Sequence, residues 1–339
     1  MWQIENRTPF QTAGTFLRDE NGHEVWCIAL RASFQVNEAG QVFRAPDQSP
    51  VEMVPRYAGE DLSQTLIAEE DFIPFSPVTD VTLTGVISPQ SAAPQPVLLQ
   101  FSVDNKIRKD LLLFPPRQAQ FRRGRWHLAD VADQIPCPLD WRESFGGTQP
   151  EGDQTPPENP VGKGLALRSQ QPEGTPIDLP RIEAAGSDCL RDPKQATAAN
   201  YCPMPRWWQG RIIRAGTFDA GWQQARAPLM PLDHDRRFAC AAPLDQLPAT
   251  HLKGGETVTL QGFQPGPALM FRLPQLVLRA ETVFDGGVQR QDFHLGRVNF
   301  DLGTGLLNLV WLSALRCDGR DHLIKRSRVS LQQISGVQR

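Results

Sequence analysis

Proline interrupts this chain so often that its sequence argues against a fold built from long helices. Of the 339 residues, 30 are proline, well above the usual share of ~5%. Proline lacks a backbone N–H and clashes with the preceding turn, so it breaks helix interiors. Hydrophobic residues make up 40% of the chain, which is enough for a real core. The sequence therefore predicts many short, turn-bounded segments around that core.

The first third of the chain contains short apolar and β-branched runs that are typical of strands. The run at 24–36 follows the turn dipeptide Asn21-Gly22, and the run at 81–87 alternates apolar and polar residues. We expect strands at residues 24–36, 81–87, 97–103 and 111–114. Residues 61–70 predict one short helix, opened by Asp61 and Ser63.

Short apolar and β-branched runs occur again in the last third of the chain, after Gly254-Gly255. Short turns at 285–287 and 301–305 contain glycine and favour hairpins. We expect strands at residues 257–261, 268–273, 276–284, 291–300 and 306–315. The last three of these strands would form an antiparallel meander.

These patterns predict a mainly β protein with antiparallel sandwich or barrel-like sheets. Residues 1–129 and 251–339 would supply the sheets, as one compact unit or as two lobes. Residues 130–250 would form an irregular central segment rich in Gly, Pro and Trp, with one or two helical turns at 235–242. No long amphipathic helix is visible in that segment.

A polar stretch at 141–164 has two glycine features at its ends and no apolar period. Glycine serves where φ is positive or where another backbone comes close, and we expect positive φ at Gly147 and Gly162. One interpretation is an ordered loop that braces the sheets or a partner site, with a tolerant middle at 149–157. The other is an ordinary surface loop. The expected structural turn residues are Gly146, Gly147, Asn159, Pro160, Gly162 and Gly164.

A second stretch, at 206–214, concentrates tryptophan and arginine. These residue types are enriched at binding hot spots because they bury much area and still offer donors. The alternative is that both tryptophan rings fill a core between irregular segments. The candidate partner-binding residues are Arg206, Trp207, Trp208, Arg211 and Arg214.

Charge and hydropathy exclude several classes of partner. The net charge of −3 gives no bulk electrostatic support for binding nucleic acid. The N-terminus lacks the pattern of a secretory signal, and the apolar run at 306–315 is too short to span a bilayer. Six scattered cysteines do not resemble a secreted disulfide framework. We expect a cytoplasmic protein without membrane insertion.

No motif assembles a catalytic or cofactor site. Dinucleotide, phosphate-loop, G-x-S-x-G, C-x-x-C and H-E-x-x-H patterns are all absent from the sequence. Asp233-His234-Asp235, with Cys240 and His251 downstream, matches no standard zinc spacing, and a turn rich in hydrogen bonds is favoured there. We expect no metal, no cofactor and no enzymatic activity.

Several short stretches occur along the chain in a characteristic order and spacing. They are NRTPF at 6–10, VTDVTLTG at 78–85, Phe145-Gly146-Gly147, 159–164, WQGRIIRAGTFD at 208–219, Trp222, 228–235, AAPLDQ at 241–246, Gly255-Glu256 and FRLP at 271–274. In this order and spacing they resemble a bacterial domain-of-unknown-function family that is encoded beside type VI secretion spike genes, those of VgrG and PAAR proteins. Departures from the family pattern occur at Ser76-Pro77 and at Trp311-Leu312, where Lys-Pro and Trp-Arg are expected.

The resemblance implies an adaptor or chaperone that is neither a toxin nor an enzyme. Such a protein binds an effector, often through its PAAR-containing part, and helps to load it onto the VgrG spike. Two rival functions come from the residues alone. One is a hydrolase with a site around Asp233 to His251, and the other is a carbohydrate-binding β module that uses Trp207 and Trp208.

Overall fold

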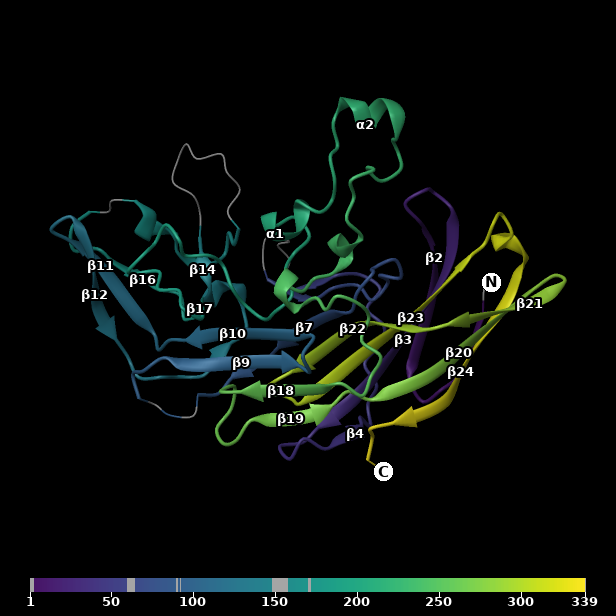
Figure 1. Cartoon of the computed structure of the whole chain (residues 1–339), viewed down its shortest axis with the longest axis horizontal. Helices are drawn as coiled ribbons and strands as arrows, with labels where there is room; N and C mark the ends of the chain where they lie inside the picture. The colour runs from purple at the N-terminus through teal and green to yellow at the C-terminus, as the bar shows by residue number, and fades with distance from the viewer. Residues whose placement is uncertain are drawn as a thin grey trace.

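The computed structural model describes residues 3–59, 65–89, 91, 93–147, 158–169 and 172–338. The fold is mainly β, with three larger sheets, several short strand pairs and few helical turns. Figure 1 shows the larger sheets across the lower part of the molecule, with α2 projecting above them. Among the described strands no sheet closes on itself, so the arrangement is a sandwich of open sheets.

The central sheet has six strands and joins both ends of the chain. Its order is β2-β3-β23-β22-β7, and β4 pairs with the end of β3. All these pairs are antiparallel except β22 with β7. Its strands are β2 (Gln11–Arg18), β3 (Glu24–Val36), β4 (Val42–Arg44), β7 (Asp80–Thr84), β22 (His294–Asp301) and β23 (Leu306–Arg316).

Two further sheets again combine strands from both ends of the sequence. A four-stranded sheet has the order β1-β24-β20-β21, and a five-stranded sheet has the order β17-β10-β9-β18-β19. The first contains β1 (Gln3–Arg7), β20 (Gln275–Phe284), β21 (Gly287–Asp292) and β24 (Ile324–Ser335). The second contains β9 (Val97–Val103), β10 (Ile107–Leu113), β17 (Ile182–Ala184), β18 (Thr257–Gln261) and β19 (Leu269–Arg272).

The remaining elements are short. The small sheets contain β5 (Arg56–Tyr57), β6 (Leu66–Ala68), β8 (Val86–Ile87), β11 (Arg117–Arg122), β12 (Arg125–Val131), β13 (Cys137–Pro138), β14 (Phe145–Gly146), β15 (Lys163–Gly164) and β16 (Pro176–Asp178). The α-helices are α1 (Gln209–Ile212) and α2 (Ala220–Ala225). Single 3-10 turns span Trp141–Glu143, Leu165–Arg168, Arg236–Ala239, Leu244–Gln246 and Asp321–Leu323.

One cluster of buried side chains runs through the three larger sheets. Alternate residues of β3, including Leu30 and Phe34, point into it together with Phe101 of β9 and Leu278 of β20. The indole N–H of Trp26 donates to Ser327 Oγ at 2.9 Å, which links the six-stranded sheet to β24. Side-chain alternation along strands thus gives one face of the six-stranded sheet to the main core.

The predicted strands at 24–36, 97–103 and 257–261 are confirmed residue for residue. The strand at 81–87 is interrupted at Gly85, where φ is +98° and a Cβ would lie 2.7 Å from the backbone of Gly303. The strand predicted at 111–114 is the end of a longer one, β10. The apolar pattern does not mark the first half of this strand, because Lys109 points inward, where its ammonium group donates to the carbonyl of Asn200 at 2.7 Å.

Two predictions of local structure are wrong. Residues 61–64 of the predicted helix at 61–70 lie outside the described residues, but Leu66–Ala68 form strand β6, paired with β5. The expected meander is also wrong, because the run at 291–300 divides at Phe293. Strand β21 pairs with β20 in the four-stranded sheet, whereas β22 pairs with β23 in the six-stranded sheet. The chain therefore changes sheets at Phe293.

Candidate functional site

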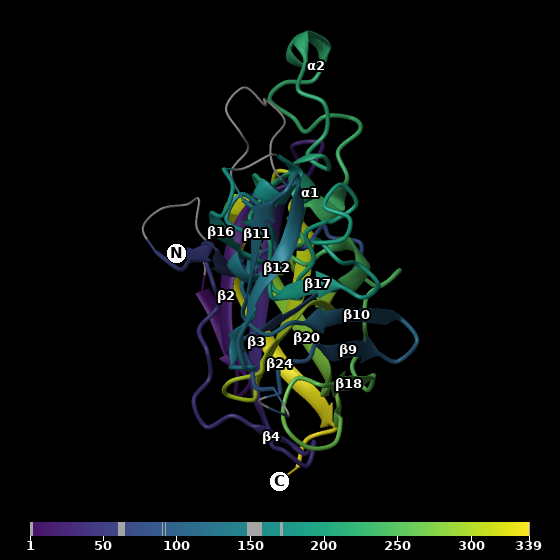
Figure 2. The same cartoon turned by 90° about the vertical axis from the view of Figure 1, so that its left-hand side faces the viewer.

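The most prominent feature of the central segment is an arm, residues 213–235, that carries α2. Figures 1 and 2 show from two directions that the arm projects away from the sheets. Ile213 is 62% exposed, Phe218 is 53% exposed and Leu232 is 88% exposed. Exposed apolar side chains gathered on one projection are typical of a protein interaction site.

The two limbs of the arm are held together at its base. The carboxylate of Asp233 accepts hydrogen bonds from the backbone N–H of Thr217 at 3.0 Å and from its hydroxyl at 2.7 Å. Buried Arg214 donates to the carbonyl of Arg237 at 3.1 Å, and its own carbonyl accepts from the N–H of Asp235 at 3.0 Å. The arm is therefore a built projection with fixed limbs.

The arm is also fastened to the turn between β2 and β3. Arg226 donates to the carbonyl of Glu20 at 2.9 Å, and Arg236 donates to the carboxylate of Glu20 at 2.8 Å. At the tip, the rings of Phe218 and Trp222 lie edge to face with centroids 4.8 Å apart. These contacts fix the direction in which the arm points.

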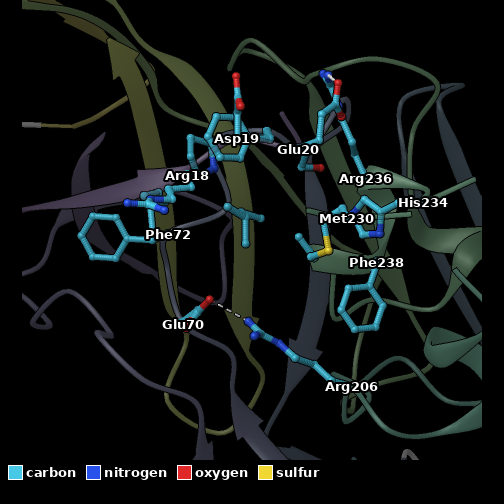
Figure 3. Close-up of a pocket in the computed structure, with 16 residues that line it drawn as sticks. Arg18, Asp19, Glu20, Glu70, Phe72, Arg206, Met230, His234, Arg236 and Phe238 are labelled. Atoms are coloured by element: carbon cyan, nitrogen blue, oxygen red, sulfur yellow. Dashed lines mark hydrogen bonds and ion pairs between the residues drawn. The ribbon is translucent and has the colours of Figure 1, made fainter. Parts of the chain in front are cut away.

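A pocket of about 230 Å³ opens where the arm meets the β2–β3 turn. Figure 3 shows Phe72 and Arg18 on one side of this pocket and Met230 and Phe238 on the other, with the pair Glu70–Arg206 at one end. Its apolar lining comes from three separate segments. The apolar lining residues are Leu17, Phe72, Ile73, Pro74, Phe75, Met230, Phe238 and Ala239.

Most of the candidate partner-binding residues at 206–214 are buried. Trp208 is 2% exposed and packs edge to face on Trp141 with centroids 5.7 Å apart. Arg211 is fully buried, and Arg214 is 6% exposed. In this structure the side chains of these three residues hold the interior together, and they offer no surface to a partner.

Arg211 belongs to a buried ion-pair network with Glu69. Its guanidinium donates to Glu69 at 2.6 Å and to the carbonyls of Met204 and Phe238 at 2.7 and 2.8 Å. Burial alone would raise the pKa of Glu69, but the charges of Arg211, Arg206 and Arg297 outweigh it and lower that pKa. Because Glu69 stays ionised, the network joins the 206–214 stretch firmly to the segment that precedes β7.

Arg206 and Trp207 remain at the surface. The Arg206 side chain is 34% exposed and pairs with Glu70 at 2.7 Å. Trp207 is 39% exposed, and its ring lies 5.4 Å from that of Tyr57, centroid to centroid. The expected partner surface at 206–214 stays a prediction for these two residues.

The ends of the loop at 145–164 meet in a short parallel pair. Phe145–Gly146 pairs with Lys163–Gly164, and buried Asn159 donates to the carbonyls of Trp141 and Phe145 at 2.7 and 3.1 Å. Pro160, which follows Asn159, is half-buried. Phe145 and Leu165 then pack in a second hydrophobic cluster with Ala119 of β11. The described ends thus connect the interior with the three-stranded sheet, while the middle at 149–157 lies outside the described residues.

The glycines at these ends are required for two different reasons. Gly147 has a φ of +128°, which confirms the prediction, and Gly146 and Gly164 also have positive φ. The prediction of positive φ at Gly162 is wrong. A Cβ there would instead lie 2.4 Å from Asn159 Nδ2 and 2.6 Å from the Ser144 carbonyl oxygen, so close approach requires this glycine.

In the Asp233 to His251 region, the side chains of His234, Asp235 and Cys240 make local structural contacts. His234 Nδ1 lies 3.1 Å from the Ala215 carbonyl, Asp235 caps the following 3-10 turn, and Cys240 contacts Ser76. The favoured interpretation of this region as a hydrogen-bonded turn is confirmed. Across the described residues, no group of three or more His, Cys, Asp or Glu side chains is placed to hold a metal ion.

The six cysteines are all buried and form no disulfide. Burial raises the pKa of Cys240 to about 12, so this thiol stays protonated. Within the part of the chain that the structure describes, no helix has the length and hydrophobicity needed to cross a bilayer.

A family model described as an uncharacterized protein conserved in bacteria (DUF2169) matches residues 21–312, which include every strand of the six-stranded sheet apart from β2 and the end of β23. The chain belongs to this family. No curated protein and no solved structure matches it. The family match covers both the loop at 145–164 and the arm.

Proposed function

We propose that this protein is a cytoplasmic adaptor of type VI secretion. In this proposal it binds an effector, through the PAAR-containing part of that effector, and assists its loading onto the VgrG spike. The resemblance of the motifs to proteins encoded beside spike genes supports the proposal, and the family to which the chain belongs is bacterial. The protein acts by binding and catalyses no reaction.

The observation that carries this proposal is the display of apolar side chains on the arm. Ile213, Phe218 and Leu232 are 62%, 53% and 88% exposed on a projection whose limbs are fixed by hydrogen bonds. A preorganised apolar surface binds with a smaller ordering cost than a flexible one. The adjoining apolar pocket of about 230 Å³ offers room for a side chain of the partner.

Co-expression with the effector encoded beside this protein, followed by co-purification, tests the proposal. The variant Ile213→Ser/Leu232→Ser removes two exposed apolar groups of the arm, and we expect binding to weaken at least about tenfold. The matched control is Leu128→Ser/Val288→Ser, which changes residues that are 49% and 57% exposed on strands β12 and β21. Equal binding by the two variants would count against the arm as the docking surface.

The genes that neighbour this one provide a second, inexpensive test. A spike gene and a toxin gene beside it are expected if the protein is an adaptor. Co-purification from the native host, followed by mass spectrometry, would then identify the bound effector. A chain that is encoded away from any spike gene and purifies without an effector would contradict the proposal.

A further inference from the structure

The face of the six-stranded sheet that turns away from the main core changes character halfway along its strands. At one end, Cys27, Ala29, Val310 and Leu312 pack with Phe72 and Ile73 in a small apolar cluster. At the other end, the same face carries Ser33, Thr82, Asn299 and Asn308. Since this face can be covered by apolar packing, the polar half needs an explanation.

The polar half is a row of side chains that crosses four adjacent strands in register. Thr82 of β7 is opposite Asn299 of β22, which is opposite Asn308 of β23, which is opposite Ser33 of β3. Asn299 Nδ2 donates to Thr82 Oγ1 at 3.0 Å, and Ser33 Oγ donates to Asn308 Oδ1 at 2.7 Å. We call these four residues the polar row.

A cavity of about 650 Å³ lies against the polar row, with Thr82, Asn299 and Asn308 in its wall. Residues of the segment before β7, including Ser49, Glu52 and Leu66, also line the cavity. This volume lies within the range of small-molecule sites, which is roughly 300–1,000 Å³. Ser33 is fully buried, Thr82 is 3% exposed and Asn308 is 5% exposed, so these three residues are shielded from bulk water, while Asn299 is half-buried.

The ionised groups at one end of this cavity neutralise one another. Arg31 pairs with Asp71 at 2.9 Å, and Arg297 pairs with Asp80 at 3.0 Å and with Asp71 at 3.3 Å. Asp80 also accepts from the backbone N–H groups of Ala241 and Ala242. A charged ligand would have to compete with these buried pairs, whereas an uncharged ligand would not.

Buried amides and hydroxyls are costly unless they make hydrogen bonds, and a ligand can supply such bonds. Each amide and hydroxyl group can both donate and accept, which matches the hydroxyl groups of a sugar. Departures from an apolar pattern at the centre of a sheet are expected at functional sites. Size and polarity favour the same class of ligand. The carboxylate of Asp301, which also lines the cavity, makes no ion pair with any described residue and accepts hydrogen bonds from the hydroxyl of Thr84 and the N–H of Thr304, and it can equally accept from a sugar hydroxyl.

We infer that this cavity binds a neutral, hydroxyl-rich small molecule of the size of a mono- or disaccharide. The polar row forms the hydrogen-bonding wall of the site. The paired arginines and aspartates hold the segment that precedes β7 against the sheet, and this segment supplies a further part of the cavity lining. The inference is independent of the adaptor proposal, because the cavity and the arm share none of the residues on which the two arguments depend.

The test measures the melting temperature of the full chain with glucose, N-acetylglucosamine, maltose and trehalose. At least one of these sugars should raise it. In the variant Thr82→Val/Asn299→Leu, both members of a hydrogen-bonded pair become apolar, so neither is left buried and unpaired. This variant should bind that sugar at least about tenfold more weakly, measured by calorimetry.

The matched control is Thr259→Val/Gln261→Leu, which removes similar groups from β18, away from the cavity. It should bind as the native chain does. If the double variant in the cavity does not fold, Asn299→Asp replaces it, since this change keeps the side-chain shape and removes the amide donor. The inference is overturned if none of the four sugars raises the melting temperature, or if the cavity variant responds as strongly as the control.

Discussion

The stretch 206–211, which we call the base, and the arm at 213–235 place large side chains in opposite environments. At the base, Trp208 and Arg211 are buried and bonded to distant parts of the chain. On the arm, Ile213 follows Arg211 by two residues and Leu232 lies on the returning limb, and both side chains face solvent. Trp208 is buried whereas its neighbour Trp207 is 39% exposed, so a local concentration of tryptophan and arginine does not distinguish interior from surface. What distinguishes them is a partner such as Glu69, 142 residues from Arg211 along the chain.

The largest effect is expected at the base. Replacing Arg211 by alanine leaves buried Glu69 without its closest partner, and we expect a loss of about 3–5 kcal/mol in the free energy of unfolding. The control is Arg237→Ala, because the Arg237 side chain is 48% exposed and pairs with its near neighbour Asp235. That change should cost about 0–1 kcal/mol. Denaturant unfolding measures both values, and similar losses in the two variants would remove the contrast between base and surface.

How far the sequence predicts this structure depends on how local the cause is. The strand at 24–36 was predictable because its apolar and β-branched composition and its flanking turns lie within the strand itself. The change of sheet at Phe293 and the ion pair of Arg211 with Glu69 depend on residues far away in the chain. Strand β24, Ile324–Ser335, was missed because charged and polar residues occupy many of its positions.

The same distinction between local and distant causes applies to the candidate site. The turn function of Gly147 followed from glycine chemistry alone, and the structure confirms its positive φ. The exposure of Phe218 and Leu232 could not be predicted, because the apolar residues of the arm have no period that marks a buried face. The only local signal is that they lie between turn-forming residues such as Gly216, Asp219 and Asp233.

The next largest loss of stability is expected at the two ends of the loop at 145–164, which also lie in the central segment. In Gly162→Val a Cβ would lie 2.4 Å from Asn159 Nδ2, and we expect a loss of about 1–3 kcal/mol in unfolding free energy. Gly287→Val is the control, since a Cβ there would have no heavy atom within 4 Å. Thermal unfolding of the two variants checks this. A native-like melting temperature for Gly162→Val would mean that the stretch is an ordinary surface loop.

A smaller effect should appear as a dependence of stability on pH. The folded-state pKa of Glu69 lies below its ordinary value of 4.5, because the charges of Arg211, Arg206 and Arg297 outweigh the effect of burial. A lowered pKa contributes stability that is present above pH 4.5 and is lost as the pH falls through the folded pKa. The variant Glu69→Gln should therefore lose less stability than the native chain as the pH falls from about 5 through the range in which carboxyl groups titrate. Parallel pH profiles would show that Glu69 does not contribute in this way.

The smallest effect on stability is expected on the arm. Ile213→Ser/Leu232→Ser changes side chains that are already 62% and 88% exposed, so the free energy of unfolding should stay within about 0.5 kcal/mol of the native value. Binding of the effector should nevertheless weaken, which separates the arm from the base. A large loss of stability in this variant would mean that the arm supports the fold instead of displaying a surface.

Hydrogen–deuterium exchange of the protein with and without its co-purified effector tests the central claim most directly. The backbone amides of residues 213–235 should exchange more slowly in the complex, together with those of 70–76, which line the adjoining pocket. Amides of β18 and β19, on the five-stranded sheet, should exchange at the same rate in both states. Protection confined to other regions, with unchanged exchange in the arm, would contradict the proposal that the arm is the surface on which the effector docks.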